Sequence, residues 1–115
     1  MSYEARPRAF DAPAGVDGTY ERTTDMVHET IDALVATASK RGVDIEPWEV
    51  TEYTGAISHD YEVAGDKTNI EFTASDPIYN RLLSKMDDSI TGARALSALR
   101  ASWVVLAHMQ HTLRA

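Results

Sequence analysis

The 115-residue sequence contains no cysteine. Disulfide frameworks, thiol nucleophiles and cysteine-based zinc or iron–sulfur sites are therefore excluded. Basic residues are also scarce, because 11 lysine and arginine residues stand against 18 aspartate and glutamate residues, which gives a net charge of −7. A protein that binds the phosphate backbone of nucleic acids needs a basic surface, so direct nucleic-acid binding is not expected.

Long apolar runs are missing as well. The longest runs from Trp103 to Ala107, far short of the roughly 20 residues of a transmembrane helix. Residues 1–17 also lack the apolar core of a secretory signal. We therefore expect a cytoplasmic protein that does not enter a membrane. The length and the 43% of apolar residues suffice for one domain whose core needs no metal or disulfide.

The ends of the chain differ in character. Pro7, Pro13, Gly15 and Gly18 interrupt the first residues, where no apolar period is visible. This composition predicts a flexible N-terminal arm over residues 1–18 and a single domain over 19–115.

A long helix is predicted over about residues 20–41, because apolar residues recur there at three- and four-residue steps. Lys40 and Arg41 occupy its last turn, where cations complement the helix dipole. Gly42 follows as a C-terminal stop.

The middle of the chain, about residues 48–75, is expected to form an antiparallel β-hairpin or small sheet. Apolar and polar residues alternate over 57–63 and again over 69–74, and the intervening 64–67 are turn-forming residues. Residues 43–54 are open between a strand and a short helix that begins at Pro47, and we favour the strand because Val50, Thr51 and Tyr53 are strand formers.

Two further helices complete a fold of the α+β class. Asp76-Pro77 resembles a helix start and predicts a short helix, and a last helix is predicted from about residue 90 to 113. A helix of about 23 residues spans roughly 35 Å, which is long for a compact domain of this size. We therefore expect a homodimer packed along a seam of this helix, formed by Leu96, Leu99, Trp103, Leu106 and Leu113.

Sites for metal or catalysis are not recognisable as motifs. His108 and His111 lie three residues apart on one predicted helix and could join His28 around a metal, although histidines in such places more often cap helices or face solvent. No His-Glu-x-x-His pattern, nucleophile elbow, phosphate loop or dinucleotide fingerprint is present. We therefore assign no catalytic residue, metal ligand or cofactor.

Acidic charge is concentrated in one segment. Residues 43–77 carry nine acidic residues and one lysine, a net charge of −8, whereas residues 78–115 carry a net charge of +3. Such a surface steers toward a basic protein surface, for example that of a nucleic-acid-binding protein. Plain solvation of a polar face is the alternative. The predicted partner-binding residues include three that share one polar face of the expected hairpin: Asp60, Glu62 and Glu71, joined by Glu49 and Glu52.

The sequence thus predicts a small acidic, non-enzymatic protein-binding protein that acts as an inhibitor or regulator. Small acidic proteins of phages and mobile elements, including inhibitors of nucleases and of CRISPR complexes, are similar in size and charge, although no motif is shared. Two alternatives remain open. One is a structural or assembly subunit that acts through the helical seam, and the other is a metal- or small-molecule-binding helical protein.

Overall fold

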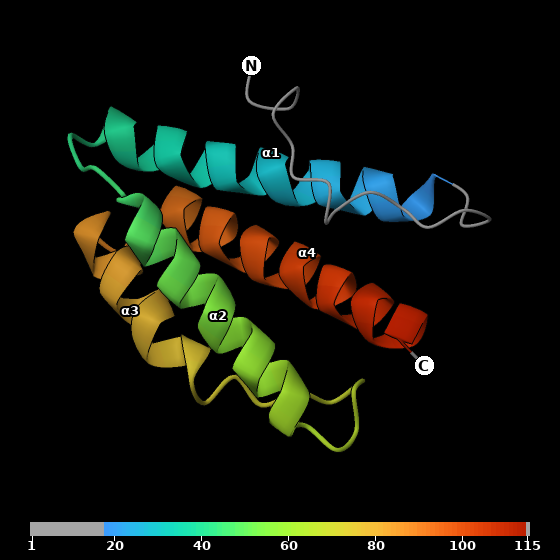
Figure 1. Cartoon of the computed structure of the whole chain (residues 1–115). Helices are drawn as coiled ribbons and strands as arrows, with labels where there is room; N and C mark the ends of the chain where they lie inside the picture. Colours follow the sequence, from blue (N-terminus) through green and yellow to red (C-terminus); the bar gives the residue numbers. More distant parts are fainter. Residues whose placement is uncertain (1–17, 115) are drawn as a thin grey trace.

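Four helices make up the protein in its computed structural model, which describes residues 18–114 (Figure 1). Of the predicted arm over residues 1–18, all but Gly18 lies outside the described residues. The helices are α1 (Thr19–Lys40), α2 (Pro47–Val63), α3 (Ser75–Lys85) and α4 (Ile90–Arg114).

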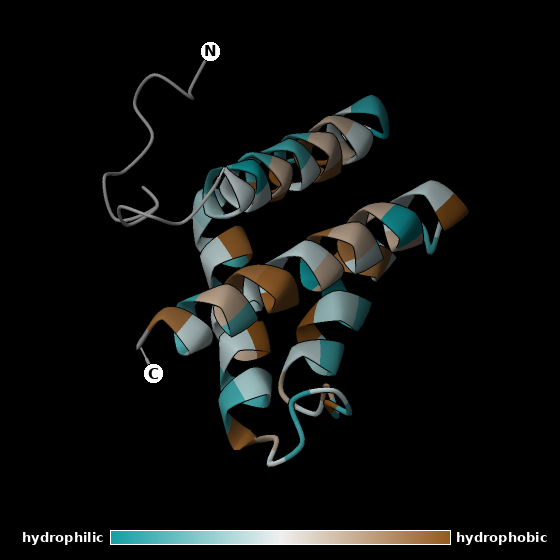
Figure 2. Ribbon diagram, turned by 90° about the vertical axis from the view of Figure 1, so that its right-hand side faces the viewer, coloured by the Kyte–Doolittle hydropathy of each residue, from teal (hydrophilic) through white to brown (hydrophobic). Residues whose placement is uncertain are grey.

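The central element is α4, which contacts each of the other three helices. On one side it packs antiparallel to α1, and on the other it meets the antiparallel pair of α2 and α3 (Figure 1). Hydrophobic residues lie mainly on the sides of the helices that face one another (Figure 2). None of these helices has an apolar stretch long enough to cross a bilayer, which agrees with the sequence, whereas the cytoplasmic location stays a prediction.

The core is built on both sides of α4. Leu96, Leu99 and Leu106 of α4 are fully buried or nearly so, and they form one cluster with apolar residues of the other helices. Burial of a leucine side chain contributes about 2 kcal/mol. The cluster also contains the following residues from α1, α2, α3 and the segments between them: Tyr20, Val27, Leu34, Ala38, Ile45, Tyr53, Ile57, Leu82 and Met86.

The predicted α1 is confirmed, including its end. Gly42 has a φ of +75°, a left-handed conformation that glycine adopts without steric cost. This turn lets the Gly42 N–H bond the carbonyl of Ser39 at 3.0 Å and the Val43 N–H bond that of Ala38 at 3.0 Å. Two carbonyls that the helix leaves unpaired are thereby satisfied. The short and long C-terminal helices are also present, as α3 and α4.

The predicted α+β fold is wrong, because residues 18–114 contain no strand and the expected hairpin over 48–75 does not form. Residues 47–63 are instead the helix α2, which begins at Pro47. A four-residue spacing explains this outcome, because Tyr53, Ile57 and Tyr61 are all fully buried. His59 lies in the same alternating run as Ile57 and Tyr61, yet it is exposed.

The second half of the predicted hairpin, residues 69–74, belongs to an irregular connection between α2 and α3. Phe72 does not extend a sheet here. Its ring lies 4.2 Å from the guanidinium carbon of Arg100 on α4, which also stacks on Tyr79 at 4.8 Å. Cation–π contacts therefore hold this connection against α4.

Candidate binding cleft

An open cleft of about 510 Å³ lies where α2 ends and the connection to α3 begins. His59, Asp60 and Val63 line it from α2, and Asn69 and Glu71 line it from the connection. Of these five residues, only Asp60 is buried, and the other four are exposed to solvent. The cleft therefore offers a ligand polar side chains together with the apolar surface of Val63, Ala64 and Ala74.

Asp60 forms the structural floor of this cleft. It is only 4% exposed, and its two carboxylate oxygens accept hydrogen bonds from the backbone N–H groups of Ala74 (2.8 Å) and Ser75 (2.9 Å). These N–H groups lie at the start of α3, where a helix has unpaired donors and a positive partial charge. Asp60 of α2 thus caps α3, although it is distant in sequence. Its hydrogen bonds hold Ala74, which also lines the cleft, in place.

The ammonium group of Lys67 binds the C-terminal end of α2. It donates to the carbonyl of Tyr61 at 2.8 Å and to that of Glu62 at 3.4 Å, and it lies 4.5 Å from the centre of the Tyr61 ring. The last carbonyls of a helix carry a negative partial charge, which favours a cation at this position. The C-terminal end of α2 is therefore a cation-binding end, occupied on one side by a lysine of the chain itself.

The turn that carries Lys67 is shaped by Asp66. One carboxylate oxygen of Asp66 accepts the N–H of Thr68 at 3.0 Å and its hydroxyl at 2.7 Å. These two hydrogen bonds lower the pKa of Asp66 below its ordinary value. The turn is thereby held by local contacts of a kind that favour loops over regular structure.

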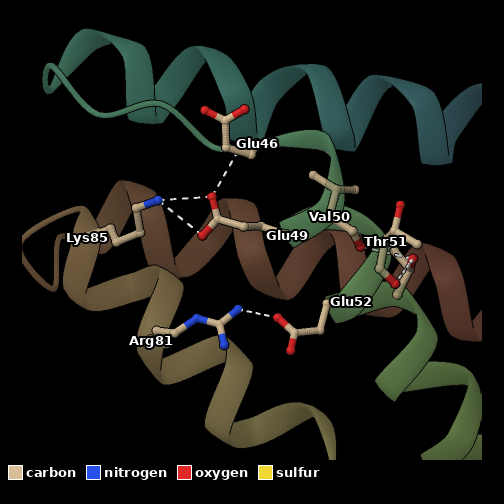
Figure 3. A network of polar contacts seen from close by, with 8 residues as sticks. Glu46, Glu49, Val50, Thr51, Glu52, Arg81 and Lys85 are labelled. Carbon is tan, nitrogen blue, oxygen red and sulfur yellow. Dashed lines mark hydrogen bonds and ion pairs between the residues drawn. The ribbon is translucent and has the colours of Figure 1, made fainter.

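The other end of α2 binds cations of α3 (Figure 3). Glu49 is only 3% exposed, and its two oxygens accept hydrogen bonds from Nζ of Lys85 at 3.0 and 3.1 Å. The backbone N–H of Glu46 donates to the same carboxylate at 2.9 Å. Burial alone would raise the pKa of Glu49, but these hydrogen bonds outweigh it and lower the pKa below 4.5. Glu52 pairs with Arg81 one turn further along α2.

The five predicted partner-binding residues therefore lie in two places. Asp60 and Glu71 line the cleft, and Glu62 is exposed on the last turn of α2. Glu49 and Glu52 lie toward the opposite end of α2, where they are paired within the chain. The shared hairpin face that was to join Asp60, Glu62 and Glu71 does not exist, because no strand forms there.

The predicted dimer seam lies largely inside the chain. Leu96, Leu99 and Leu106 are buried in the core, and Trp103 donates its indole N–H to the hydroxyl of Ser58 on α2 at 2.7 Å. Leu113 alone among the five is exposed, at 41%. At Leu96, Leu99 and Leu106, residues of α1, α2 and α3 cover the apolar surface of α4 for which a second copy is expected from the sequence.

Of the three histidines in the metal hypothesis, two lie together on α4 and the third lies on another helix. His108 and His111 of α4 both approach the ring of Tyr61, and the Tyr61 hydroxyl shares a 2.9 Å hydrogen bond with Nδ1 of His108. His28 lies on α1. No cluster of three or more histidine, aspartate or glutamate side chains suited to a metal ion occurs in the part of the chain that the structure describes.

Sequence reasoning missed two features of the cleft. The alternation over residues 57–63 puts His59 on the same strand face as Ile57 and Tyr61, but in the structure it is exposed and lines the cleft. Lys67 lies in a turn, as predicted, but its ammonium also binds the last carbonyls of α2, a contact that the sequence did not indicate. A helical interpretation of residues 47–63 would have placed His59 and Val63 one turn apart on the same face.

No protein-family model, curated protein or solved structure matches the chain. The described residues define a small four-helix domain with an open cleft at the end of α2.

Proposed function

We propose that the protein is a non-enzymatic binding protein that takes a basic segment of a partner protein into the cleft at the end of α2. The observation that carries this proposal is the contact of Lys67 with the last carbonyls of α2. A lysine ammonium already occupies one side of this helix end, so the chemistry of the site suits the lysine or arginine of a partner.

The distribution of acidic side chains supports the same site. Glu49, Glu52 and Asp76 form ion pairs with basic residues of α3 and α4. Glu62 and Glu71 form none among the described residues, and both are exposed at or beside the cleft. Much of the acidic charge of residues 43–77 thus serves the fold, and the remainder near the cleft is available to steer a basic partner.

A protein that covers a basic surface in this way would act as a regulator or an inhibitor of its partner. A nucleic-acid-binding protein offers a basic surface of the required kind, because it must neutralise phosphates. The proposed mode is competition: the acidic cleft occupies lysine and arginine side chains that the partner otherwise presents to its nucleic acid.

The proposal is tested by calorimetric titration with a short peptide of alternating lysine and glycine. We expect the double variant Glu62→Lys/Glu71→Lys to bind about tenfold more weakly than the unchanged protein, equivalent to about 1.4 kcal/mol. The matched control is Glu29→Lys/Asp44→Lys, which changes the net charge equally at two exposed positions away from the cleft.

The control variant distinguishes the effect of charge at the cleft from the effect of the net charge of the protein on peptide binding. Equal weakening by both double variants would show that only net charge matters, and the proposal would be dropped. A lack of effect from Glu62→Lys/Glu71→Lys would have the same consequence.

A further inference from the structure

Most lysine and arginine side chains in the described part of the chain have a partner there. The side chains of Lys40, Arg41 and Arg94 form no hydrogen bond, ion pair or ring contact with any described residue. The cations with partners are the following: Arg22, Lys67, Arg81, Lys85 and Arg100. The three exceptions are notable in a protein with a net charge of −7, where carboxylates are in excess.

These three cations gather at one end of the molecule. Lys40 and Arg41 end α1, and Arg94 lies in the first turns of α4, three residues after Thr91. A hollow of about 440 Å³ lies between the two helix ends and is lined by Thr37, Lys40, Arg41 and Thr91. It is remote from the cleft, because the cleft is lined by Asp60, and the next residue, Tyr61, contacts α4 at His108, near the opposite end of that helix.

The backbone of α4 adds donors beside this hollow. The Ser89 hydroxyl accepts the N–H of Gly92 at 3.0 Å, and the Ser89 carbonyl accepts that of Ala93 at 2.9 Å. The N–H groups of Ile90 and Thr91 have no acceptor among the described residues. No acidic residue lies in the first turn of α4, and none lines the hollow.

We infer that this hollow binds the phosphate group of a small molecule. Lys40 and Arg41 supply the positive charge, and the hydroxyls of Thr37 and Thr91 supply further donors to the phosphate oxygens. A pocket of this size is typical of small-molecule sites. The overall negative charge of the protein opposes the ligand only weakly, because salt screens charges beyond roughly 8 Å at physiological ionic strength. This inference is independent of the proposed cleft, which takes ligands of the opposite charge.

A purely structural explanation makes a different prediction. Lys40 and Arg41 also complement the negative end of the α1 dipole. If that were their whole role, removing either charge would lower the stability of the helix slightly and would leave the affinity for phosphate unchanged. The experiment therefore has to measure binding and stability separately.

The test is a titration of the unchanged protein with inorganic phosphate, followed by the backbone amide NMR signals of Ile90 and Thr91. Sodium chloride at equal ionic strength is the reference. We expect saturable shifts of these two signals with phosphate and none with chloride. A second titration with glycerol phosphate distinguishes the source of the group: tighter binding than inorganic phosphate assigns the site to a phosphate ester, and equal binding assigns it to free phosphate.

Two variants at opposite ends of α1 provide the control. Arg41→Gln removes a charge at the hollow, and Arg22→Gln removes the same charge at the start of the helix. We expect about tenfold weaker phosphate binding for Arg41→Gln and unchanged binding for Arg22→Gln, with Lys40→Gln behaving like Arg41→Gln. Thermal unfolding by circular dichroism confirms that each variant is folded. Linear, unsaturable shifts, or equal binding by Arg41→Gln and Arg22→Gln, would overturn the inference.

Discussion

At the residue scale, one buried carboxylate joins three segments of the chain. Glu49 on α2 accepts hydrogen bonds from Lys85 on α3 and from the backbone N–H of Glu46. Lys85 also donates to the carbonyl of Asp44 at 3.1 Å. Loss of one partner from such a pair is costly, because the other group keeps its desolvation cost without the compensating contacts.

The variant Glu49→Gln tests this contact. Because the pKa of Glu49 is lower in the folded state than its ordinary value of 4.5, ionised Glu49 stabilises the fold at neutral pH. That contribution is lost as the pH falls through the folded-state pKa. We expect a free energy of unfolding about 1–2 kcal/mol below that of the unchanged protein at neutral pH. Urea titrations should show the gap narrowing as the pH falls below the ordinary value of 4.5, and a gap independent of pH would contradict the assignment.

Two glycines within helices give opposite predictions. A Cβ at position 92 would lie 2.9 Å from Oγ of Ser89 and 3.2 Å from Cβ of Met86, whereas a Cβ at Gly55 would meet nothing within 4 Å. The Ser89 oxygen cannot move freely, because it caps α4 through the Gly92 N–H.

We therefore expect Gly92→Ala to destabilise the protein by about 1–2 kcal/mol despite the better helix propensity of alanine. Gly55→Ala should stabilise it by about 1 kcal/mol. Urea unfolding of the two variants side by side measures both effects, and stabilisation by both substitutions would show that Met86 and Ser89 are not closely packed against Gly92.

At the scale of the elements, α3 depends on a residue outside it. Its first turn contains Asp76 and Pro77, as the sequence suggested, but the N-cap position is Ala74, which has no side-chain acceptor. The carboxylate of Asp60 fills that role from α2. A carboxylate near a helix start also interacts favourably with the helix dipole.

We expect Asp60→Ala to lower the free energy of unfolding by about 2 kcal/mol, because the buried N–H of Ser75 and the partly buried N–H of Ala74 lose their acceptor. Asp66→Ala is the matched control, since Asp66 is an exposed aspartate of the adjoining turn. It should change stability by less than about 1 kcal/mol. Hydrogen exchange at Ala74 and Ser75 reports the effect locally. Unchanged protection in Asp60→Ala would show that α3 does not need this cap.

The sequence predicted those elements whose signals agree with one another. For α1, the apolar period, the cations of the last turn and Gly42 all indicate the same helix, and the structure contains it. For α2 the signals conflict. Its strand-forming residues and short alternation favoured a strand, whereas Pro47 and the four-residue spacing of Tyr53, Ile57 and Tyr61 favoured a helix. Packing against α4 decides between them, because Tyr53 donates its hydroxyl to the carbonyl of Leu96 at 2.9 Å.

The cleft was only partly accessible to sequence reasoning. Asp60 and Glu71 do line a common site, although no hairpin brings them there. Asp60 can cap α3 only because the start of α3 lies beside the end of α2. A pattern of neighbouring residues in the sequence does not reveal this arrangement. The ion pairs of Glu49 and Glu52 with α3 are invisible for the same reason, since each joins residues far apart in the sequence.

At the scale of the whole molecule, α4 is the element on which the other helices meet. The sequence predicts a dimer because this helix is long and apolar, and one chain is not expected to cover it. In the structure, residues of α1, α2 and α3 cover Leu96, Leu99 and Leu106. An additional copy is therefore not required to bury this part of α4.

Sedimentation velocity tests this point directly. We expect a single species with the mass of one chain, 12.7 kDa. Trp103→Ala should lower the free energy of unfolding by about 3 kcal/mol, because it removes the contact of α4 with Ser58 on α2. A species of twice the mass that Trp103→Ala dissociates, with no loss of stability of the single chain, would instead support the helical dimer seam.

The two tryptophans stand in very different surroundings, and this gives the protein its own pair of optical probes. Trp48 is 62% exposed at the start of α2, while Trp103 is partly buried and hydrogen-bonded to Ser58. Emission from Trp103 should shift to longer wavelength when α2 separates from α4, because its indole then enters water. In a Trp48→Phe background that shift reports the opening of the α2–α4 contact alone, so a ligand that acts on α2 can be followed without a label.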